Sequence, residues 1–395
     1  MTSVDELKQL AKLVRYNIVT STTEAQSGHA TSALSAVELL TTLFFGGYFR
    51  QNLESPHELN NDKFILSKGH SSPLLYSIYQ AAGVVTREEL LTLRKYGSPL
   101  EGHPTPRFKY ADVATGSLGQ GLSIGLGMAL GLELKTKSEK LKVIPKIFVL
   151  MGDSEFAEGQ IYEALQLASH YKTSNLIGIL DVNRLGQRGE TMLGWDIETY
   201  AKRAESFGWH VEIIEDGHNI EKILETYQNL FENTKYQIPN TKPKLIIAKT
   251  VKGKGFSIFE DQENWHGKPI PKEQLADSLK EIGEVNLELN GQIAKPQSND
   301  ELRIMNDESR QEEKLQAPSY KLQELYSTRE AYGDALVLLG QTDPNLVVLD
   351  AETSNSTYSE KFKSAYPNRF FEMYIAEQNM ISVALGMSKV GLHPF

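Results

Sequence analysis

Short apolar runs alternate with amphipathic helical patterns through the middle of this chain, and this alternation restricts its fold more than any other feature. Four segments of strand length and largely apolar character occur at residues 146–151, 175–181, 209–214 and 244–249, of which 209–214 also contains His210 and Glu212. Three helical patterns separate them, at residues 158–171, 197–207 and 220–231. Runs that are apolar throughout are typical of parallel strands buried on both faces. The alternation therefore predicts an α/β fold, with a parallel sheet between helices and ligand sites at the carboxyl ends of its strands.

The length and the changes in pattern predict two domains of this kind. The chain has 395 residues, more than one ordinary domain of roughly 100–200 residues. Residues 281–327 are polar with few apolar anchors, as in a linker, and helix and strand signals resume after them. We predict a first domain at 1–280, a linker at 281–327, and the N-terminal part of a second, incomplete α/β domain at 328–395.

Composition and charge exclude several classes of function. The chain has 41 lysines and arginines against 51 aspartates and glutamates, and its net charge of −10 argues against binding nucleic acid through phosphates. It contains no cysteine, so it has no disulfide, no thiolate zinc site and no cysteine nucleophile, which suits an intracellular protein. No stretch of about 18 residues is apolar and free of charge, and we predict no membrane span.

Two polar residues follow neighbouring strands of the predicted sheet. Asp153 comes just after the strand at 146–151, and Asn183 follows the next strand, thirty positions later. Because neighbouring parallel strands end at one edge, both side chains should point into the same crevice. With two diphosphate oxygens, a backbone carbonyl and a water, they would complete a shell for Mg²⁺ or Ca²⁺. Either residue alone is as compatible with a plain turn, but the pair predicts a metal site.

The same segment carries a resemblance to a known family. Gly152-Asp-Ser154 to Asp181-Val-Asn183 resembles the thiamine diphosphate motif, which runs from Gly-Asp-Gly to an asparagine. The chain outside the linker resembles transketolase of the animal-like subgroup. The further matching motifs, in the family's order, are Ser27-Gly-His-Ala-Thr-Ser32, Leu66-Ser-Lys-Gly-His70, Glu101-Gly-His-Pro104, Ala114-Thr-Gly-Ser-Leu-Gly-Gln-Gly121, Ala248-Lys-Thr-Val-Lys-Gly-Lys-Gly255, Trp265-His-Gly-Lys268 and Ile375-Ala-Glu-Gln-Asn-Met380.

The resemblance implies a role for each matching residue. The metal ligands would be Asp153, Asn183 and the backbone carbonyl of Leu185. The cofactor contacts would be Ser32, Lys68, His70, Gly116, Ser117, Leu118, Gly152, Asp153, Ser154, Asn183, Lys252, His266 and Glu377. The substrate contacts would be His29, His103, His266, Arg329 and Ser356, of which the last two would hold phosphate. The catalytic groups would be Glu377, His29, His70, His103 and His266.

The four histidines of this set each stand beside a glycine. Imidazole titrates near neutral pH and glycine lets a ligand approach the backbone, which suits hydrogen bonding to sugars and proton transfer. Each one taken singly is as compatible with an ordinary core or surface histidine. The remaining histidines, read as ordinary or terminal residues, are His57, His170, His210, His218 and His393. No His-x-x-x-His spacing occurs, so no transition-metal site is predicted.

Two positions depart from the family pattern, and one glycine-rich run has a second interpretation. Ser154 stands where the family usually has glycine, which puts cofactor affinity in doubt. Ala30 replaces a common proline and should loosen one loop. The run at 116–127 also resembles a dinucleotide fingerprint, but no strand clearly precedes it, and a small-residue helix packed against a neighbour explains most of it.

The implied activity is ketol transfer. Glu377 would hydrogen-bond the cofactor's pyrimidine nitrogen and favour the tautomer that generates the thiazolium ylid. A two-carbon unit would then pass from a ketose phosphate, such as xylulose 5-phosphate, to an aldose phosphate, such as ribose 5-phosphate. The resemblance also implies a cytoplasmic homodimer with active sites at the subunit interface. The preferred sugars and the choice between Mg²⁺ and Ca²⁺ stay open.

Three alternatives also stay open. The chain could be another ketol transferase, of the dihydroxyacetone synthase or deoxyxylulose-phosphate synthase type. It could be a non-catalytic transketolase-like protein, although Asp153, Asn183 and Glu377 argue against this. It could be half of an enzyme with a separate second subunit. Because the second domain ends one helix after Glu377, we expect the chain as given to be an inactive fragment.

Overall fold

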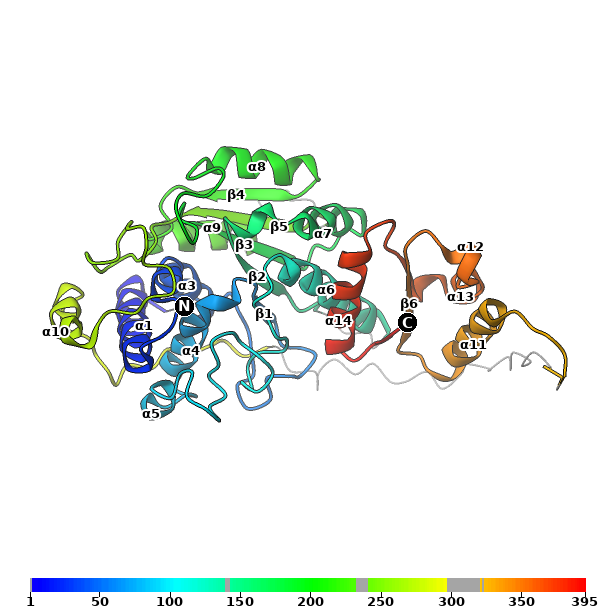
Figure 1. Cartoon of the computed structure of the whole chain (residues 1–395), viewed down its shortest axis with the longest axis horizontal. Coiled ribbons are helices and arrows are strands. Elements are labelled where there is room, and N and C mark those ends of the chain that lie inside the picture. Colours follow the sequence, from blue (N-terminus) through cyan, green and yellow to red (C-terminus); the bar gives the residue numbers. More distant parts are fainter. Residues whose placement is uncertain (1, 139–142, 232–240, 297–319, 322) are drawn as a thin grey trace. The chain divides into compact units, whose positions relative to one another are not determined.

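The structure, a computed structural model, describes residues 2–138, 143–231, 241–296, 320–321 and 323–395 (Figure 1). The chain divides into two compact units. The first unit is Met1–Leu122 with Pro145–Gln297, and the second unit is Ser123–Ile144 with Ser298–Phe395. The second unit therefore includes a segment that lies inside the predicted first domain. Most of the linker predicted at 281–327 lies outside the described residues.

The first unit is built on a parallel sheet of five strands in the order β1-β2-β3-β5-β4. The strands are β1 (Lys63–Leu66), β2 (Ile147–Gly152), β3 (Leu176–Val182), β4 (His210–Ile214) and β5 (Lys244–Lys249). The four predicted strands are confirmed. The sequence analysis did not single out β1, because its four residues are too few to show a period. Every residue of β1, β2 and β3 is buried, as expected for a sheet covered on both faces.

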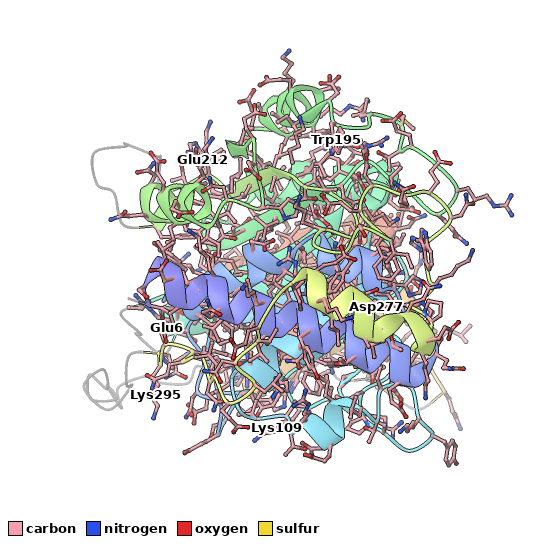
Figure 2. All side chains as sticks on the ribbon, turned by 90° about the vertical axis from the view of Figure 1, so that its left-hand side faces the viewer. Glu6, Lys109, Trp195, Glu212, Asp277 and Lys295 are labelled. Carbon is pink, nitrogen blue, oxygen red and sulfur yellow. The ribbon has the colours of Figure 1, made fainter. Side chains whose placement is uncertain are left out.

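Nine helices of the described residues accompany this sheet in the first unit. They are α1 (Val4–Ala25), α2 (Ala30–Leu34), α3 (Val37–Phe45), α4 (Ser72–Ala81), α5 (Arg87–Leu90), α7 (Gly159–His170), α8 (Ile197–Ser206), α9 (Ile220–Phe231) and α10 (Lys272–Glu281). The main core joins alternate sheet residues such as Phe148, Ile177 and Ile246 to apolar side chains of α1, α3, α4 and α9. Charged side chains such as Glu6 and Asp277 lie on the outside of this layer (Figure 2).

The second unit has a smaller parallel sheet in the order β7-β6-β8. Its elements are α6 (Gln120–Ser138), which begins in the first unit, α11 (Thr328–Thr342), β6 (Leu346–Asp350), α12 (Ser354–Thr357), α13 (Glu360–Ala365), β7 (Phe370–Glu372), α14 (Glu377–Lys389) and β8 (His393–Pro394). The helix and strand signals expected after residue 327 are present in this unit, with β6 and β7 as strands. Strand β8 also pairs with β6.

Helix α6 explains the glycine-rich run. A Cβ atom on Gly127 would lie 2.0 Å from the carbonyl oxygen of Val383, and one on Gly386 would lie 2.1 Å from that of Ile124. The backbones of α6 and α14 therefore touch, and only glycine fits at either position. Asn379 Nδ2 donates a hydrogen bond to Ser123 Oγ across the same contact (2.8 Å). The small-residue packing inferred from the sequence is confirmed.

The described helices include none that is both long and apolar enough to cross a membrane.

Candidate functional site

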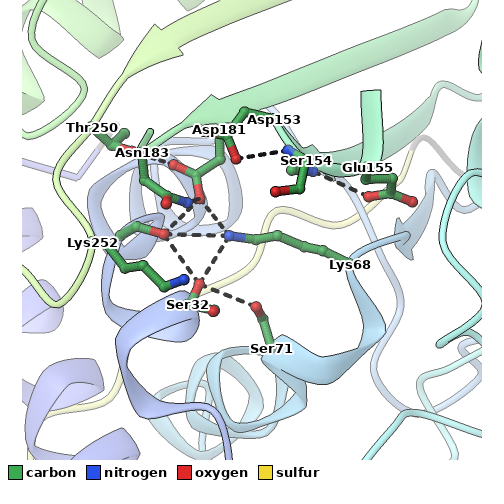
Figure 3. A network of polar contacts seen from close by, with 12 residues as sticks. Ser32, Lys68, Ser71, Asp153, Ser154, Glu155, Asp181, Asn183, Thr250 and Lys252 are labelled. Carbon is green, nitrogen blue, oxygen red and sulfur yellow. Dashed lines mark hydrogen bonds and ion pairs between the residues drawn. The ribbon is translucent and has the colours of Figure 1, made fainter. Parts of the chain in front are cut away.

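A cavity of about 250 Å³ opens in the first unit where β2 and β3 end (Figure 3). Eleven of the predicted site residues line it, namely Ser32, Lys68, His70, Leu118, Gly152, Asp153, Ser154, Asn183, Leu185, Lys252 and His266. Glu155, Gly186 and Gln187 also line it and were not predicted. Parallel pairing places Gly152 beside Asp181, so the residues after both strands meet at one edge of the sheet. The crevice predicted from strand order is present.

Asp153 and Asn183 are both buried and held at fixed orientations. Asp153 Oδ1 accepts a hydrogen bond from the backbone N–H of Ser154 (2.9 Å), and Oδ2 accepts one from that of Arg184 (2.7 Å). Asn183 Nδ2 donates to Asp181 Oδ2 (3.2 Å), which turns the amide oxygen away from that carboxylate. Burial, with the charge of Asp181, raises the pKa of Asp153 to about 6. A carboxylate whose charge is disfavoured in this way is one that a bound cation would stabilise.

A divalent cation fits this donor set. One carboxylate, one amide oxygen and a backbone carbonyl are hard oxygen ligands of the kind that Mg²⁺ and Ca²⁺ take. No cluster of three or more His, Cys, Asp or Glu suited to a metal ion occurs among the described residues. The carbonyl of Leu185, the third predicted ligand, accepts a hydrogen bond from Lys252 Nζ (2.7 Å).

A buried ion pair lies beneath the cavity. Lys68 Nζ contacts Asp181 Oδ2 and donates to the carbonyl of Ser32 (2.9 Å) (Figure 3). Burial alone would raise the pKa of Asp181, but the charge of Lys68 and hydrogen bonds from Lys68, Ser35 and Thr250 lower it overall. Because its contacts with Asp181 and Ser32 compensate the buried charge, Lys68 is held at the cavity wall.

Three of the predicted histidines form one cluster. The ring centroids of His29 and His70 are 5.0 Å apart, those of His29 and His266 are 4.8 Å apart, and those of His70 and His266 are 5.3 Å apart. Burial, with the charge of neighbouring groups, lowers the pKa of His29 and of His266 to about 4, and it lowers the pKa of His70 well below the usual range. The cluster is therefore neutral near pH 7 and can both donate and accept hydrogen bonds.

The fourth histidine, His103, packs against the backbone of Gly116. Gly116 has a φ of +140°, and a Cβ on it would lie 2.8 Å from the His103 ring. Burial, with the charge of Arg94, lowers the pKa of His103. Four of the predicted site residues in the first unit do not line the cavity itself, namely His29, His103, Gly116 and Ser117. They belong to the same unit, and the glycines of these motifs permit close packing between loops.

Glu155 is a residue at this site that the sequence analysis missed. Its carboxylate accepts hydrogen bonds from the Ser67 hydroxyl and from the backbone N–H groups of Gly119 (2.9 Å) and Gly152 (3.1 Å). Each donor is the chain neighbour of a residue that lines the cavity, namely Lys68, Leu118 or Asp153. One buried carboxylate therefore connects three loops of the cavity. Only its position two residues after Asp153 could have indicated it.

The two departures from the family pattern are compatible with the backbone. Ser154 has a φ of −61°, which any residue adopts, so this position does not require glycine. Ala30 is the first residue of α2, where both alanine and proline suit a helix.

Three predicted residues belong to the second unit. Glu377 is the first residue of α14 and is exposed. Arg329 Nη1 donates to the backbone carbonyl of Ser356 (3.2 Å), so the structure brings these two predicted phosphate contacts together. Both are exposed.

Comparisons with known proteins agree with this geometry. The family model "Transketolase, thiamine diphosphate binding domain" matches residues 7–331, and "Transketolase, pyrimidine binding domain" matches residues 324–395. The chain is 43% identical to transketolase-like protein 2 of Mus musculus, over 98% of this chain and 59% of the relative. It is also 43% identical to transketolase of Homo sapiens, over 96% of this chain and 58% of the relative.

A solved structure extends the comparison to the fold. The crystal structure of transketolase from Campylobacter jejuni matches with a TM-score of 0.84 and 26% identity, over 100% of this chain and 65% of that one. This chain therefore spans less than two thirds of the length of the relatives named here.

Proposed function

Since this chain belongs to the transketolase family, we propose that its cavity binds the diphosphate of thiamine diphosphate through a divalent cation. The observation that carries this proposal is the placement of Asp153, Asn183, Lys68 and Lys252 around one cavity at the carboxyl ends of β2 and β3. Oxygen ligands for a cation and two lysines beside them suit a diphosphate. The chain spans less than two thirds of its relatives, so their whole activity comes to it as a proposal.

We propose that the activity is ketol transfer between sugar phosphates, with xylulose 5-phosphate as a donor and ribose 5-phosphate as an acceptor. Thiamine diphosphate, when bound, supplies a nucleophilic carbon that can cleave a ketose beside its carbonyl. The chain's own residues would position this group and move protons. Asp153, Asn183 and the Leu185 carbonyl would hold the cation, and Gly116, Ser117 and Leu118 would contact the ring end of the cofactor.

The histidine cluster would handle the sugar. His29, His70, His103 and His266 have lowered pKa values and are neutral near pH 7. A neutral imidazole can accept a proton at one nitrogen and donate at the other, as a shuttle between sugar hydroxyls requires. His29 Nδ1 is buried and has no hydrogen-bond partner among the described residues. A substrate hydroxyl at this atom would satisfy it.

The roles of the second unit follow from the family in the same way. Glu377 would hold a proton against the pyrimidine nitrogen of a cofactor bound by a second copy, in a homodimer with active sites at the subunit interface. Arg329 and Ser356, which the structure places together, would hold the substrate's phosphate. A cytoplasmic location belongs to the same set of proposals.

Calorimetric titration of the chain with thiamine diphosphate tests the cofactor proposal. We expect binding in the presence of Mg²⁺ or Ca²⁺ and none with a chelator. Asp153→Asn removes the only charged side chain on the cation and should weaken binding by roughly 100-fold. Asp277→Asn, a matched change on the exposed face of α10, should leave the affinity unchanged.

Equal affinity with and without the chelator would overturn the metal assignment. Failure of wild-type protein to bind the cofactor under all conditions would favour the alternative of a non-catalytic relative.

A further inference from the structure

The loop after β5 carries Lys252 to the cavity wall. Lys252 Nζ donates to the carbonyls of Leu185 (2.7 Å) and Gly186 (2.9 Å) and lies 3.1 Å from His266 Nδ1. These contacts place the ammonium of Lys252 in the wall of the cavity that Asp153 and Asn183 also line (Figure 3). They also place it next to His266 of the histidine cluster. Only 3% of Lys252 is exposed, so its position depends on the path of the backbone on either side of it.

His218 contacts the backbone of this loop at the residue before Lys252. It lies in the turn between β4 and α9, and its Nε2 accepts a hydrogen bond from the backbone N–H of Val251 (2.8 Å). Gly217 permits the approach, since a Cβ there would lie 2.6 Å from Thr250 Cγ2 and 2.9 Å from the carbonyl oxygen of Lys249. A backbone N–H can only donate, so Nε2 carries no proton and Nδ1 is the protonated nitrogen.

The protonated nitrogen of His218 is held in turn by Glu38 of α3. The distance from His218 Nδ1 to Glu38 Oε2 is 2.9 Å, and Glu38 also pairs with Arg15 of α1, whose Nη2 lies 2.9 Å from Oε2. Burial disfavours the charge of Glu38, but the charge of Arg15 and the hydrogen bonds hold its pKa at about 2. Arg15 Nε donates to the carbonyl of Lys254 (3.1 Å). The network therefore holds the loop at Val251 and at Lys254, on both sides of Lys252.

We propose that His218 is a positioning residue, which holds the loop of residues 251–254 so that Lys252 stays in the cavity wall beside Leu185 and Gly186. Its Nε2 fixes the start of the loop, and the Glu38–Arg15 pair fixes His218 and the end of the loop. The role of Lys252 toward a diphosphate rests on the proposed function. The positioning itself concerns only the chain's own atoms and can be measured without a cofactor.

Two matched substitutions separate the contacts of His218. In His218→Asn the side-chain amide occupies the place of Nδ1, so it can still donate to Glu38 but does not reach the Val251 N–H. In His218→Gln the amide oxygen occupies the place of Nε2 and can still accept from Val251. Both variants are neutral and polar. His218→Asn keeps the contact with Glu38 and loses the one with Val251, whereas His218→Gln keeps the one with Val251 and loses the one with Glu38.

Acetylation of lysines by an amine-reactive ester, read by peptide mass spectrometry on the full chain, tests the proposal. In wild-type protein, Lys252 should react slowly, as should the buried Lys63 and Lys244, which lie in β1 and β5. His218→Asn should raise the rate at Lys252 by roughly tenfold, in line with a lost hydrogen bond, and leave Lys63 and Lys244 unchanged. His218→Gln should keep the rate at Lys252 within about twofold of wild type.

Three outcomes would overturn the proposal. Lys252 could stay protected in His218→Asn, the two variants could react alike, or Lys63 and Lys244 could become reactive together with Lys252, which would mean general loosening of the unit. Titration with thiamine diphosphate and Mg²⁺ is the second readout, and His218→Asn should bind about tenfold more weakly than His218→Gln. If wild-type protein binds no thiamine diphosphate, the proposed function fails while the acetylation result still decides the positioning.

Discussion

At the scale of single residues, the neutral histidine cluster links the site to the stability of the fold. Burial lowers the pKa of His29 and His266 to about 4, against about 6.5 for an exposed imidazole in an unfolded chain. Between these pH values the unfolded chain binds more protons than the folded one. The stability associated with the neutral histidines is therefore complete above pH 6.5 and is lost as the pH falls toward 4.

We expect the free energy of unfolding to respond to this cluster in that window. His29→Asn should make the loss of stability between pH 6.5 and pH 4 smaller by about 1–2 kcal/mol, after allowance for partial exposure of the ring. Asp153, whose pKa is raised to about 6, acts in the opposite direction but is present in both proteins. Urea denaturation at a series of pH values measures the difference. His170→Asn, at the exposed end of α7, is the control, and identical pH profiles for wild type and His29→Asn would contradict the prediction.

At the scale of elements, the contact between α6 and α14 depends on two glycines. A Cβ on Gly386 would lie 2.1 Å from the carbonyl oxygen of Ile124. Both atoms belong to the backbone of a helix, so the overlap can be relieved only by moving one helix away from the other. Gly386→Ala should therefore separate the helices and destabilise the second unit by about 3 kcal/mol.

Hydrogen exchange of amides in α14 is the direct measurement of that change. Gly159→Ala in α7 is the matched control, because a Cβ there meets nothing within 4 Å and alanine is the better helix former. Unaltered exchange in Gly386→Ala would show that the helices are not in backbone contact.

At the scale of the whole molecule, α6 belongs to a different unit from the segments before and after it. From Ser123 onward it packs with α14 and with residues near β8, where a Cβ on Gly131 would lie 2.5 Å from Val390 Cγ2. A chain of residues 1–296 would keep α6 but lose these partners. The first domain predicted at 1–280 includes all of α6, so a chain cut after that domain separates the helix from its partners.

We therefore predict that residues 1–296 bind a hydrophobic dye and aggregate more readily than residues 1–395. Dye fluorescence and light scattering of the two chains at equal concentration measure this. The reason is the apolar surface of α6, including Ile124 and Met128, which is buried in the chain of residues 1–395. If residues 1–296 prove monomeric, protease-resistant and free of dye binding, the part of α6 assigned to the second unit does not need its partners.

The sequence alone determined those features that depend on local order along the chain. Strands β2, β3 and β5 show as apolar segments because a central parallel strand is buried on both faces, whereas β4 lies at the edge of the sheet and is mostly half-buried. Asp153 and Asn183 could be placed together because each directly follows a strand, and parallel neighbours end at the same edge. The family resemblance also depends on local order, because the motifs are recognised by the spacing of their glycines and histidines along the sequence.

Only the tertiary structure decided which distant groups meet. Nothing in the sequence around His218 distinguishes it from an ordinary loop histidine, because its partners Val251 and Glu38 lie in other elements. Glu155 likewise gains its importance from loops that end near residues 67, 119 and 152. The membership of α6 in the second unit depends on contacts with residues more than 250 positions away. Such contacts arise from packing between elements, and a local period or turn signal contains no information about them.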